Sequence, residues 1–460
     1  MTLIKSISGI RGTIGGLPGD NLTPLDIVKF TAAFGTWIRN KNDGKRCAIV
    51  IGRDARTTGE MVSRIIISTL QGLGIDVVDL GLATTPTVEV AVTGTGSDGG
   101  IIITASHNPA NYNALKLLNK TGEFLSSMEG NEVLQLADEE KFMFADHDKT
   151  GSVSIDQSWN GKHIDQILNL DLVDIDAIRA ADLKVAVDCI NSVGSLIIPK
   201  LLKRLGVEKI CLLNGIPDGK FAHNPEPIPE NLKDISAMVI NEKADLGFVV
   251  DPDVDRLAII CEDGSMFGEE YTLVSVSDYV LSLHKGNTVS NMSSTSALRD
   301  VTEKYGAKYF TSAVGEVNVV EEMKIRNAVI GGEGNGGIIY PSFHYGRDAL
   351  LGIALFLSSL AKRGLNCSTL RKTYPDYFIS KKKIILQDTD DIVQILDRIK
   401  RHFENQKIDE RDGIRIENEK GWVHIRRSNT EPIIRVYAEG KSEEEAESLA
   451  EYVIGIVKKL

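Results

Sequence analysis

The sequence predicts an α/β protein with three similar α/β domains built on mixed sheets, followed by a C-terminal α+β domain. Strand-like and helix-like runs alternate three times along the chain, at a spacing of roughly 100–150 residues. In each repeat a helix-like run ends at a glycine, namely Gly74, Gly206 and Gly306. After Pro375 this order is lost, which predicts a last domain of different construction.

The first three domains are assigned from their apolar runs, taken in chain order. In the first domain these runs occupy 47–52, 61–74, 75–81 and 100–109. In the second they occupy 183–194, 195–206, 207–215 and 244–256. In the third they occupy 287–307, 308–327, 328–337 and 347–364.

The last stretch combines three strand-like runs with two amphipathic helices. The strands are predicted at 381–387, 413–429 and 433–440, and the helices at 391–406 and 443–460. The predicted domain limits are therefore 1–150, 151–260, 261–374 and 375–460.

Composition excludes several classes of protein. The net charge of -12 argues against nucleic acid as a partner, because phosphate backbones attract basic surfaces. The five cysteines form no Cys-x-x-Cys pair, so we expect reduced thiols rather than disulfides or a cysteine zinc site. No apolar run approaches the ~20 residues of a membrane span, and no signal peptide is recognised. We expect a cytoplasmic monomer or homodimer without a membrane partner.

The first candidate site is the run from Thr104 to Pro109, which follows the apolar strand 100–103. A turn at the carboxyl end of a strand is where open α/β sheets place ligand groups. Ser106 is then a hydroxyl held at a rigid edge, with His107 beside it. The same run taken alone also fits a capped turn, because Ser, Asn and Pro all favour turns.

The second candidate site contains three aspartates at alternate positions, Asp251, Asp253 and Asp255, between two apolar runs. Carboxylates this close repel one another unless a cation lies among them. Hard oxygen ligands suit Mg²⁺, which usually keeps positions open for phosphate oxygens. The pattern therefore predicts a magnesium site, and the alternative is a solvated acidic turn.

A second enzyme class also places Asp-x-Asp after a hydrophobic strand. Haloacid-dehalogenase phosphotransferases present an aspartate nucleophile in this way, normally at the start of the catalytic domain and followed by Thr or Val. Here Asp255 and Arg256 follow instead, which favours the magnesium interpretation.

Two runs, 94–99 and 332–337, contain Gly-x-Gly-x-x-Gly. A dinucleotide fingerprint needs a helix after it, whereas strand-like sequences follow both runs. Neither therefore predicts nucleotide binding. The second run is interpreted as a flexible loop that presents Glu333 and Asn335, which suit sugar hydroxyls, or as a plain turn.

Two further runs contain arginine. Arg426 opens a run with hydroxyl and amide groups, which is the donor set that a phosphate dianion needs. The alternative there is a charged hairpin loop. Arg11 lies between glycines, where the backbone can approach a ligand closely.

In this order the motifs resemble those of the α-D-phosphohexomutase superfamily, which includes phosphoglucomutase, phosphomannomutase, phosphoglucosamine mutase and phosphoacetylglucosamine mutase. The resemblance covers essentially the whole chain, with one motif in each predicted domain. It implies four domains around a central cleft. It also implies an isomerase that interconverts hexose 6-phosphate and hexose 1-phosphate through a phosphoserine and a bisphosphorylated sugar.

The resemblance assigns roles to the phosphoserine and metal motifs. Ser106 matches the serine that carries the phosphoryl group and also contacts the metal. Asp251, Asp253 and Asp255 match the Mg²⁺-binding loop, in which Pro252 replaces the usual glycine. A sugar 1,6-bisphosphate is implied as activator.

The remaining motifs match positions around the substrate. The sugar-binding loop includes Glu333 and Asn335, and the loop that grips the non-reacting phosphate includes Arg426, Ser428, Asn429 and Thr430. Other active-site positions are matched by Arg11, Lys116 and Arg256.

Two departures from the family pattern bear on chemistry and specificity. Gly337 stands where many members have a histidine with an acid/base role, so we assign that role to Lys116, His107 or His344. The segment 311–317 has the Val-Gly-Glu form seen in phosphoglucosamine mutases. Glucosamine phosphates are therefore the expected substrates, with phosphoglucomutase/phosphomannomutase activity as the alternative. More remote alternatives for the function are a metal-dependent sugar phosphatase and a non-catalytic sugar-phosphate binding protein.

Overall fold

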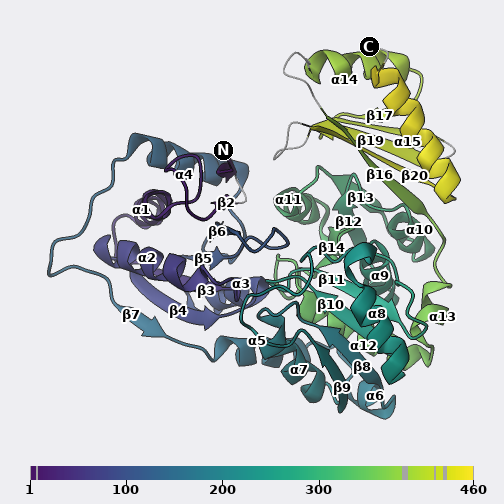
Figure 1. The fold of residues 1–460 in the computed structure, drawn as a ribbon, viewed down its shortest axis with the longest axis horizontal. Coiled ribbons are helices and arrows are strands. Elements are labelled where there is room, and N and C mark those ends of the chain that lie inside the picture. Colours follow the sequence, from purple (N-terminus) through teal and green to yellow (C-terminus); the bar gives the residue numbers. More distant parts are fainter. Residues whose placement is uncertain (1, 7–8, 386–391, 419–420, 428–432, 459–460) are drawn as a thin grey trace. The chain divides into compact units, whose positions relative to one another are not determined.

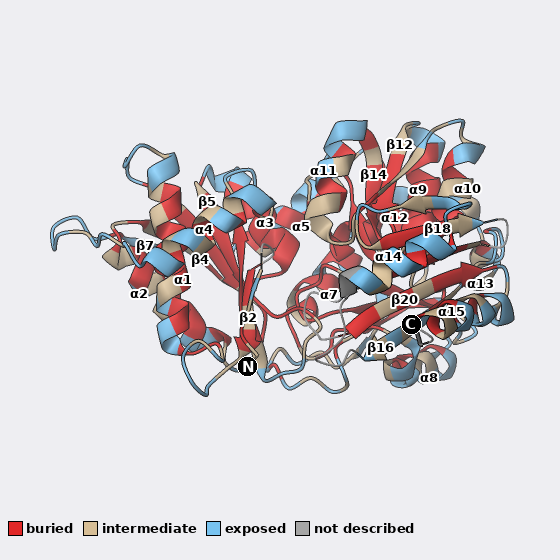
Figure 2. Cartoon of the chain, turned by 90° about the horizontal axis from the view of Figure 1, so that it is seen from above, coloured by how far each residue is buried: buried red, intermediate tan, exposed pale blue. Residues whose placement is uncertain are grey.

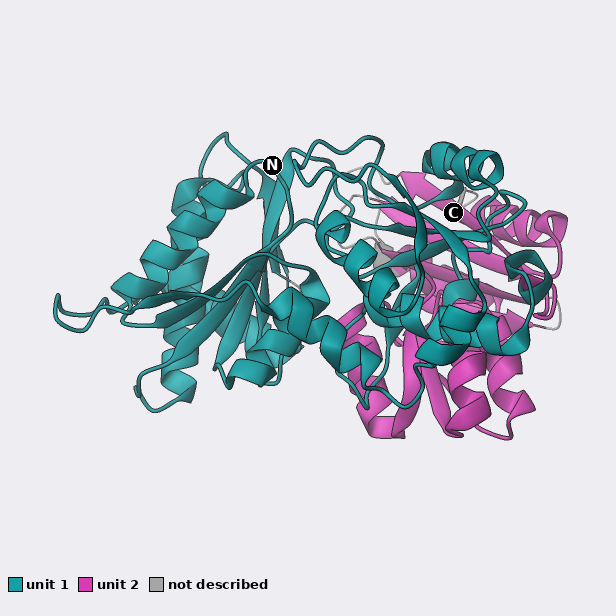
Figure 3. Cartoon of the chain, turned by 90° about the horizontal axis from the view of Figure 1, so that it is seen from below, with its two compact units in different colours: residues 1–272, 335–370 teal, residues 273–334, 371–460 magenta. Residues whose placement is uncertain are grey.

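The computed structural model of the chain describes residues 2–6, 9–385, 392–418, 421–427 and 433–458. The chain divides into two compact units (Figure 3). Unit 1 comprises 1–272 and 335–370, and unit 2 comprises 273–334 and 371–460.

Unit 1 begins with a seven-stranded mixed sheet in the order β1-β2-β6-β5-β3-β4-β7 (Figure 1). Its strands are β1 (Ile4–Ser6), β2 (Gly9–Thr13), β3 (Ala48–Arg53), β4 (Asp76–Leu82), β5 (Gly99–Ile103), β6 (Tyr112–Leu118) and β7 (Val153–Ile155). The central strand β3 pairs in parallel with β4 and β5. On the other side of β5, β6 runs antiparallel to both β5 and β2. The carboxyl ends of β3 and β5 consequently meet at one edge, where the predicted serine turn begins.

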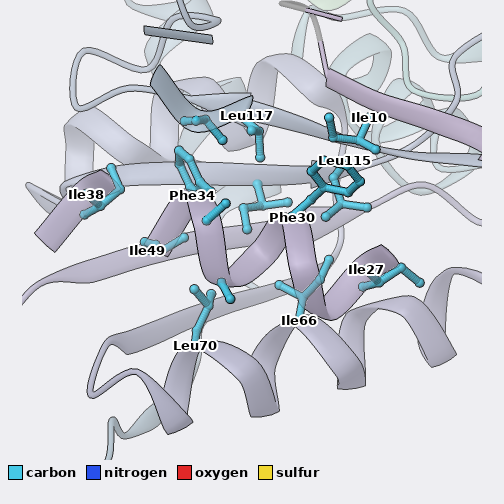
Figure 4. Packing of buried hydrophobic residues seen from close by; sticks show 14 of the residues in the cluster. Ile10, Ile27, Phe30, Phe34, Ile38, Ile49, Ile66, Leu70, Leu115 and Leu117 are labelled. Carbon is cyan, nitrogen blue, oxygen red and sulfur yellow. The ribbon is translucent and has the colours of Figure 1, made fainter. Parts of the chain in front are cut away.

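Helices cover both faces of this sheet, because its strands alternate apolar side chains toward two cores. In one core, α1 (Pro24–Lys41), α2 (Gly59–Gly72) and α4 (Ser127–Glu139) pack against the sheet. The buried side chains there include Phe34 of α1, Ile49 of β3 and Leu70 of α2 (Figure 4). The other core packs α3 (Thr85–Thr95) on Val50 and Ile102, with Trp159 beside them. Figure 2 shows the strands buried and the outer helix surfaces exposed.

The second sheet of unit 1 has four strands in the order β11-β10-β8-β9. They are β8 (Lys184–Asp188), β9 (Lys209–Leu213), β10 (Leu246–Val250) and β11 (Leu257–Cys261). β8 pairs in parallel with β9 and β10, and β11 returns antiparallel to β10. Five helices belong to the same part of the chain: α5 (Trp159–Leu168), α6 (Ile175–Ala180), α7 (Gly194–Arg204), the 3-10 helix η1 (Pro229–Asn231) and α8 (Lys233–Glu242).

The segment 335–370 completes unit 1. It contains β15 (Gly337–Ile339), α12 (Ala349–Arg363) and all but the last residue of α13 (Cys367–Arg371). α12 is buried along most of its length, and Asp348 caps its N-terminus by accepting the N–H groups of Leu350 and Leu351.

Unit 2 contains a parallel sheet followed by an antiparallel one. β12 (Asn287–Asn291) pairs in parallel with β13 (Tyr309–Ser312) and β14 (Ala328–Glu333). α9 (Tyr271–Leu283) spans the division between the units, and α10 (Ala297–Lys304) and α11 (Glu316–Arg326) complete this part. The C-terminal sheet has the order β16-β20-β19-β18-β17. Its elements are β16 (Phe378–Ile385), α14 (Ile392–His402), β17 (Lys407–Asp409), β18 (Ile414–Asn418), β19 (Gly421–Arg427), β20 (Ile433–Gly440) and α15 (Glu443–Lys458).

The predicted class, three α/β parts and a C-terminal α+β part, is confirmed, while the domain limits stay a prediction. Strands follow both Gly-x-Gly-x-x-Gly runs, as predicted. β14 extends to Glu333, however, so the loop there is shorter than the sequence indicated. All five cysteines are free. Within the described ranges, no helix combines the length and apolar character that a bilayer span requires.

Candidate active site

The serine loop (residues 104–109) begins where β5 ends. Its backbone turns at Ser106, whose φ of 48° lies in the left-handed region that non-glycine residues seldom adopt. Thr104 supports the turn, because its hydroxyl accepts the Ser106 N–H at 3.0 Å and donates to Asp54 at 2.7 Å. Ser106 is 3% exposed, so its hydroxyl is presented in an enclosed place.

Arg56 holds the serine loop from the neighbouring strand end. It follows β3, and its fully buried guanidinium forms an ion pair with Asp54, with 3.1 Å between Nε and Oδ2. At 2.6–3.0 Å it also donates to four backbone carbonyls, those of Ser106, Asn108, Pro109 and Tyr112. All five N–H donors of the guanidinium are thereby satisfied without water. The shape of the loop therefore depends on this side chain.

The aspartate loop (residues 251–256) joins the antiparallel strands β10 and β11. Asp251, Asp253 and Asp255 are fully buried, and one carboxylate oxygen of each lies within 4.8 Å of the others. Between them, buried Val254 has a φ of 63°, which is rare for a β-branched residue. Strain of this kind persists where the surrounding structure fixes a functional loop.

The two loops meet at Ser106, whose Oγ donates to Asp251 Oδ2 at 2.8 Å. The other oxygen of Asp251 accepts the N–H groups of Asp255 and Arg256, each at 3.2 Å, which fixes the carboxylate. The serine loop and the aspartate loop therefore share one site within unit 1.

The start of α3 makes a second connection to the aspartate loop. The Thr85 hydroxyl donates to Asp253 Oδ2 at 2.6 Å, and the Thr85 N–H donates to the Asp253 carbonyl at 2.9 Å. Both bonds are buried, so they place α3 and Asp253 in a fixed register.

Two buried cations neutralise part of the charge on the aspartates. Lys116, on β6, places Nζ 2.7 Å from Asp253 and 3.5 Å from Asp255. Arg347 donates to Asp255 at 2.6 Å, while Arg256 Nε stands 3.9 Å from the same residue. Three carboxylates thus face two cations at close range and a third, Arg256, slightly farther away.

Two buried carboxylate oxygens, Asp253 Oδ1 and Asp255 Oδ1, have no hydrogen-bond partner in the part of the chain that the structure describes. A buried oxygen without a donor costs about 1–3 kcal/mol, and more when it is charged. A divalent cation satisfies such oxygens. The residues present therefore fit a metal ion bound by the three aspartates.

Burial and neighbouring charges shift the pKa values of these groups, and they shift those of Asp251 and Asp255 in opposite directions. Burial, with the charges of Asp255 and Asp253, raises the pKa of Asp251 well above its ordinary value. Burial opposes ionisation of Asp255 too, but the charges of Arg347 and Lys116 outweigh it and lower the pKa of Asp255. Burial alone would lower the pKa of Lys116, but the charges of Asp253 and Asp255 outweigh it and raise the pKa of the ammonium. Lys116 therefore stays charged at neutral pH.

Two more predicted residues lie around the serine. His107 Nδ1 is 3.3 Å from Ser106 Oγ, and Arg11, on β2, donates to Asn108 at 2.7 Å. The charge of Arg256, with burial, lowers the pKa of His107 well below its ordinary value, so the ring is neutral at neutral pH. Unit 1 thus brings together eight predicted residues, namely Arg11, Ser106, His107, Lys116, Asp251, Asp253, Asp255 and Arg256.

The predicted sugar-binding residues fall in different units. Glu333 is buried in unit 2, where it accepts the Asn291 amide at 2.9 Å and the Gly315 N–H at 3.2 Å. The second bond connects it with the Val-Gly-Glu segment. Asn335 belongs to unit 1 and accepts the N–H of Gly337 at 3.2 Å, which closes its own turn.

Of the predicted phosphate-binding residues, Arg426 lies near the end of β19 in unit 2. Arg426 places Nη1 3.9 Å from Asp412. Ser428, Asn429 and Thr430 lie outside the described residues.

Sequence reasoning missed three residues that build the site: Arg56, Thr85 and Arg347. Arg56 carried a usable signal, because Asp54 and Arg56 follow a buried strand as the serine turn does. Thr85 and Arg347 carried none, since they contact aspartates that lie far away in the sequence.

Comparison with known proteins agrees with this geometry. Models of the phosphoglucomutase/phosphomannomutase family match in order: alpha/beta/alpha domain I at 3–144, domain II at 161–264, domain III at 268–377 and the C-terminal domain at 382–456. A phosphoglucomutase/phosphomannomutase of Thermococcus kodakarensis is 37% identical over 97% of this chain and 98% of its own length. The chain belongs to this family. It is therefore a phosphohexomutase, which is an isomerase.

Other relatives of this phosphohexomutase differ in the substrate that their names state. A phosphoglucosamine/phosphogalactosamine mutase of Sulfurisphaera tokodaii is 33% identical, over 98% of each chain. Among solved structures, a phosphoglucomutase/phosphomannomutase family protein of Burkholderia thailandensis is 25% identical. It has a TM-score of 0.85 and covers 99% of this chain and 97% of its own.

The buried Arg56–Asp54 pair yields a prediction on stability. Replacing Arg56 with methionine removes five donated hydrogen bonds and leaves the Asp54 charge buried, so R56M should cost about 3–5 kcal/mol. Urea unfolding followed by circular dichroism measures this loss. The matched control is R46M, because Arg46 is exposed and solvent screens its ion pair with Asp76. Equal unfolding midpoints for R56M and wild type would contradict the role given to Arg56.

Proposed function

We propose that the protein interconverts hexose 6-phosphate and hexose 1-phosphate with Ser106 as the residue that carries the transferred phosphoryl group. The observation that carries this proposal is the 2.8 Å hydrogen bond from Ser106 Oγ to Asp251. A serine hydroxyl is a weak nucleophile by itself and needs activation by its surroundings. Here the Ser106 hydroxyl lies against the aspartate loop, whose carboxylates attract positive charge. Phosphoryl transfer needs positive charge close to the transferred group.

Asp251, Asp253 and Asp255 would hold one Mg²⁺ ion, with the phosphorylated Ser106 as a further ligand. The ion would supply charge neutralisation for the phosphoryl oxygens during transfer. The two buried carboxylate oxygens that lack a hydrogen-bond partner among the described residues support this assignment.

Lys116, His107, Arg11 and Arg256 surround the serine and complete the catalytic assignment. The Lys116 ammonium stays charged beside the aspartates and donates hydrogen bonds to transferring oxygens. The His107 ring is neutral and 3.3 Å from Ser106 Oγ, so it is suited to accept a proton. Arg11 and Arg256 supply positive charge for the incoming phosphate.

Residues of the two remaining motifs are proposed to hold the substrate. Glu333 and Asn335 bind sugar hydroxyls, and the non-reacting phosphate binds Arg426, Ser428, Asn429 and Thr430. A bisphosphorylated sugar then forms and turns round between the two transfers, so that each phosphate in turn occupies the second position. A sugar 1,6-bisphosphate would act as activator, because it regenerates the phosphorylated serine.

Glucosamine phosphates are the proposed substrates, and glucose and mannose phosphates are the alternative. The segment 311–317 supports the first choice, because its Val-Gly-Glu form resembles that of phosphoglucosamine mutases. Gly315 of this segment donates to the buried Glu333. The names of relatives include both kinds of substrate, so the kinetic comparison below includes amino-sugar and neutral-sugar phosphates.

Replacing Ser106 with alanine should lower the mutase rate at least ~10³-fold, because the residue that carries the phosphoryl group is removed. A coupled assay of glucosamine 1-phosphate formation measures this rate. S152A is the matched control, since Ser152 is an exposed serine whose hydroxyl donates to Asp76 at 2.6 Å. A rate for S106A within tenfold of wild type would refute the assignment.

The choice of substrate is tested by kcat/KM for the 6-phosphates of glucosamine, glucose and mannose, each with and without its 1,6-bisphosphate. We expect the highest value for glucosamine 6-phosphate and a rise when bisphosphate is added. A higher value for either neutral sugar would overturn the amino-sugar preference. Release of inorganic phosphate without isomerisation would favour a phosphatase, and tight binding without turnover a sugar-phosphate binding protein.

A further inference from the structure

A second group of metal-binding side chains lies in unit 1 apart from the aspartate loop: the His-His-Asp cluster, formed by His163, His344 and Asp348. His163 comes from α5, His344 from the loop before α12, and Asp348 from the N-cap of that helix. The side chains of His163 and Asp348 are fully buried, and that of His344 is 12% exposed. The function proposed above uses none of the three at the aspartate loop.

The three potential ligand atoms form a compact triangle. Asp348 Oδ2 lies 2.9 Å from His163 Nε2 and 3.2 Å from His344 Nε2, and the two nitrogens are within 4.8 Å of each other. Bonds of about 2.0–2.2 Å in tetrahedral zinc sites place neighbouring ligands about 3.3 Å apart. A small adjustment therefore lets one ion contact all three atoms, with a fourth position left for water.

Each ligand is also held from behind by a second contact. His344 Nδ1 faces Glu89 Oε2 at 3.4 Å, and His163 Nδ1 is 3.0 Å from Thr87 Oγ1. The second oxygen of Asp348 accepts the two N–H groups of the α12 N-terminus. Metal-binding histidines usually have their second ring nitrogen fixed by a carboxylate or another polar group in this way.

Charge also favours a bound cation. The cluster buries two carboxylates, those of Asp348 and Glu89, beside two imidazoles that bind metals in the neutral form. One divalent ion balances both carboxylates. Two nitrogen ligands favour Zn²⁺ over Mg²⁺, which prefers oxygen. The competing arrangement has no metal and places a protonated His344 between the two carboxylates.

We propose that His163, His344 and Asp348 bind one Zn²⁺ ion at a site distinct from the aspartate loop. The ion joins α3, through Thr87 and Glu89, to α5 and to the start of α12.

Two of these segments, α3 and the start of α12, contact the aspartate loop, and this gives the zinc ion a positioning role. Thr85 of α3 donates to Asp253, and Arg347, beside Asp348, donates to Asp255. The Ala349 N–H also donates to the carbonyl of Val254 at 3.2 Å. Zinc bound at the His-His-Asp cluster would therefore stabilise the position of the aspartate loop without contacting the substrate.

Metal analysis of the purified full-length chain tests the proposal. The protein is incubated with zinc chloride, desalted and analysed by inductively coupled plasma mass spectrometry. We expect about one zinc per chain in wild type and at least a tenfold loss in H163Q and H344Q. The matched control H147Q changes an exposed histidine and should keep the zinc, as should D253N at the aspartate loop. E89Q should bind zinc about 10–100-fold more weakly.

A cobalt-substituted wild-type chain provides a readout that does not depend on the folding of a variant. Tetrahedral Co²⁺ with nitrogen ligands absorbs visible light intensely, and added zinc should abolish this band. Wild type without zinc and without the cobalt band would overturn the proposal and support the protonated His344. Equal zinc in wild type, H163Q and H344Q would overturn it as well. Metal content does not require turnover, so failure here leaves the proposed function unaffected.

Discussion

Burial of three carboxylates in one loop is the constraint on which the active site depends. Asp251, Asp253 and Asp255 are fully buried within 4.8 Å of one another, which is unfavourable unless positive charge surrounds them. Lys116 and Arg347 provide two positive charges close to the aspartates, and two of the buried carboxylate oxygens have no hydrogen-bond donor among the described residues. The same constraint makes this loop the natural place for a phosphoryl group, whose oxygens need the same cations.

The fold and the chemical centre of the site could be predicted because they depend on local pattern. Apolar runs that alternate with amphipathic helices predict the α/β parts, and polar residues directly after such runs mark strand ends. Ser106 and the three aspartates were found in this way, although they lie far apart in the sequence. Their meeting does not follow from strand order within a sheet, because β5 and β10 belong to two different sheets of unit 1 that both end at the site.

The residues that support the site could not be predicted, because their partners are distant in the sequence. Arg56 contacts carbonyls that lie 50 to 56 residues further on, and Arg347 contacts Asp255 across 92 residues. The position of Arg56 directly after a buried strand indicates a place at a strand end but not its partners, and no local pattern distinguishes Arg347 from an exposed arginine. The His-His-Asp cluster is similar, since His163 and Asp348 are 185 residues apart. The substrate preference stays a prediction, because relatives of this chain are named for different substrates.

The central claim is that Ser106, rather than an aspartate, carries the phosphoryl group, and chemical mapping tests it most directly. The purified chain is incubated with radiolabelled glucose 1,6-bisphosphate, digested, and its labelled peptide sequenced by mass spectrometry. The account predicts label on Ser106 alone, stable to hydroxylamine and transferred to added hexose phosphate. Label on Asp251 or Asp253 that hydroxylamine removes, or turnover without any labelled peptide, would contradict it.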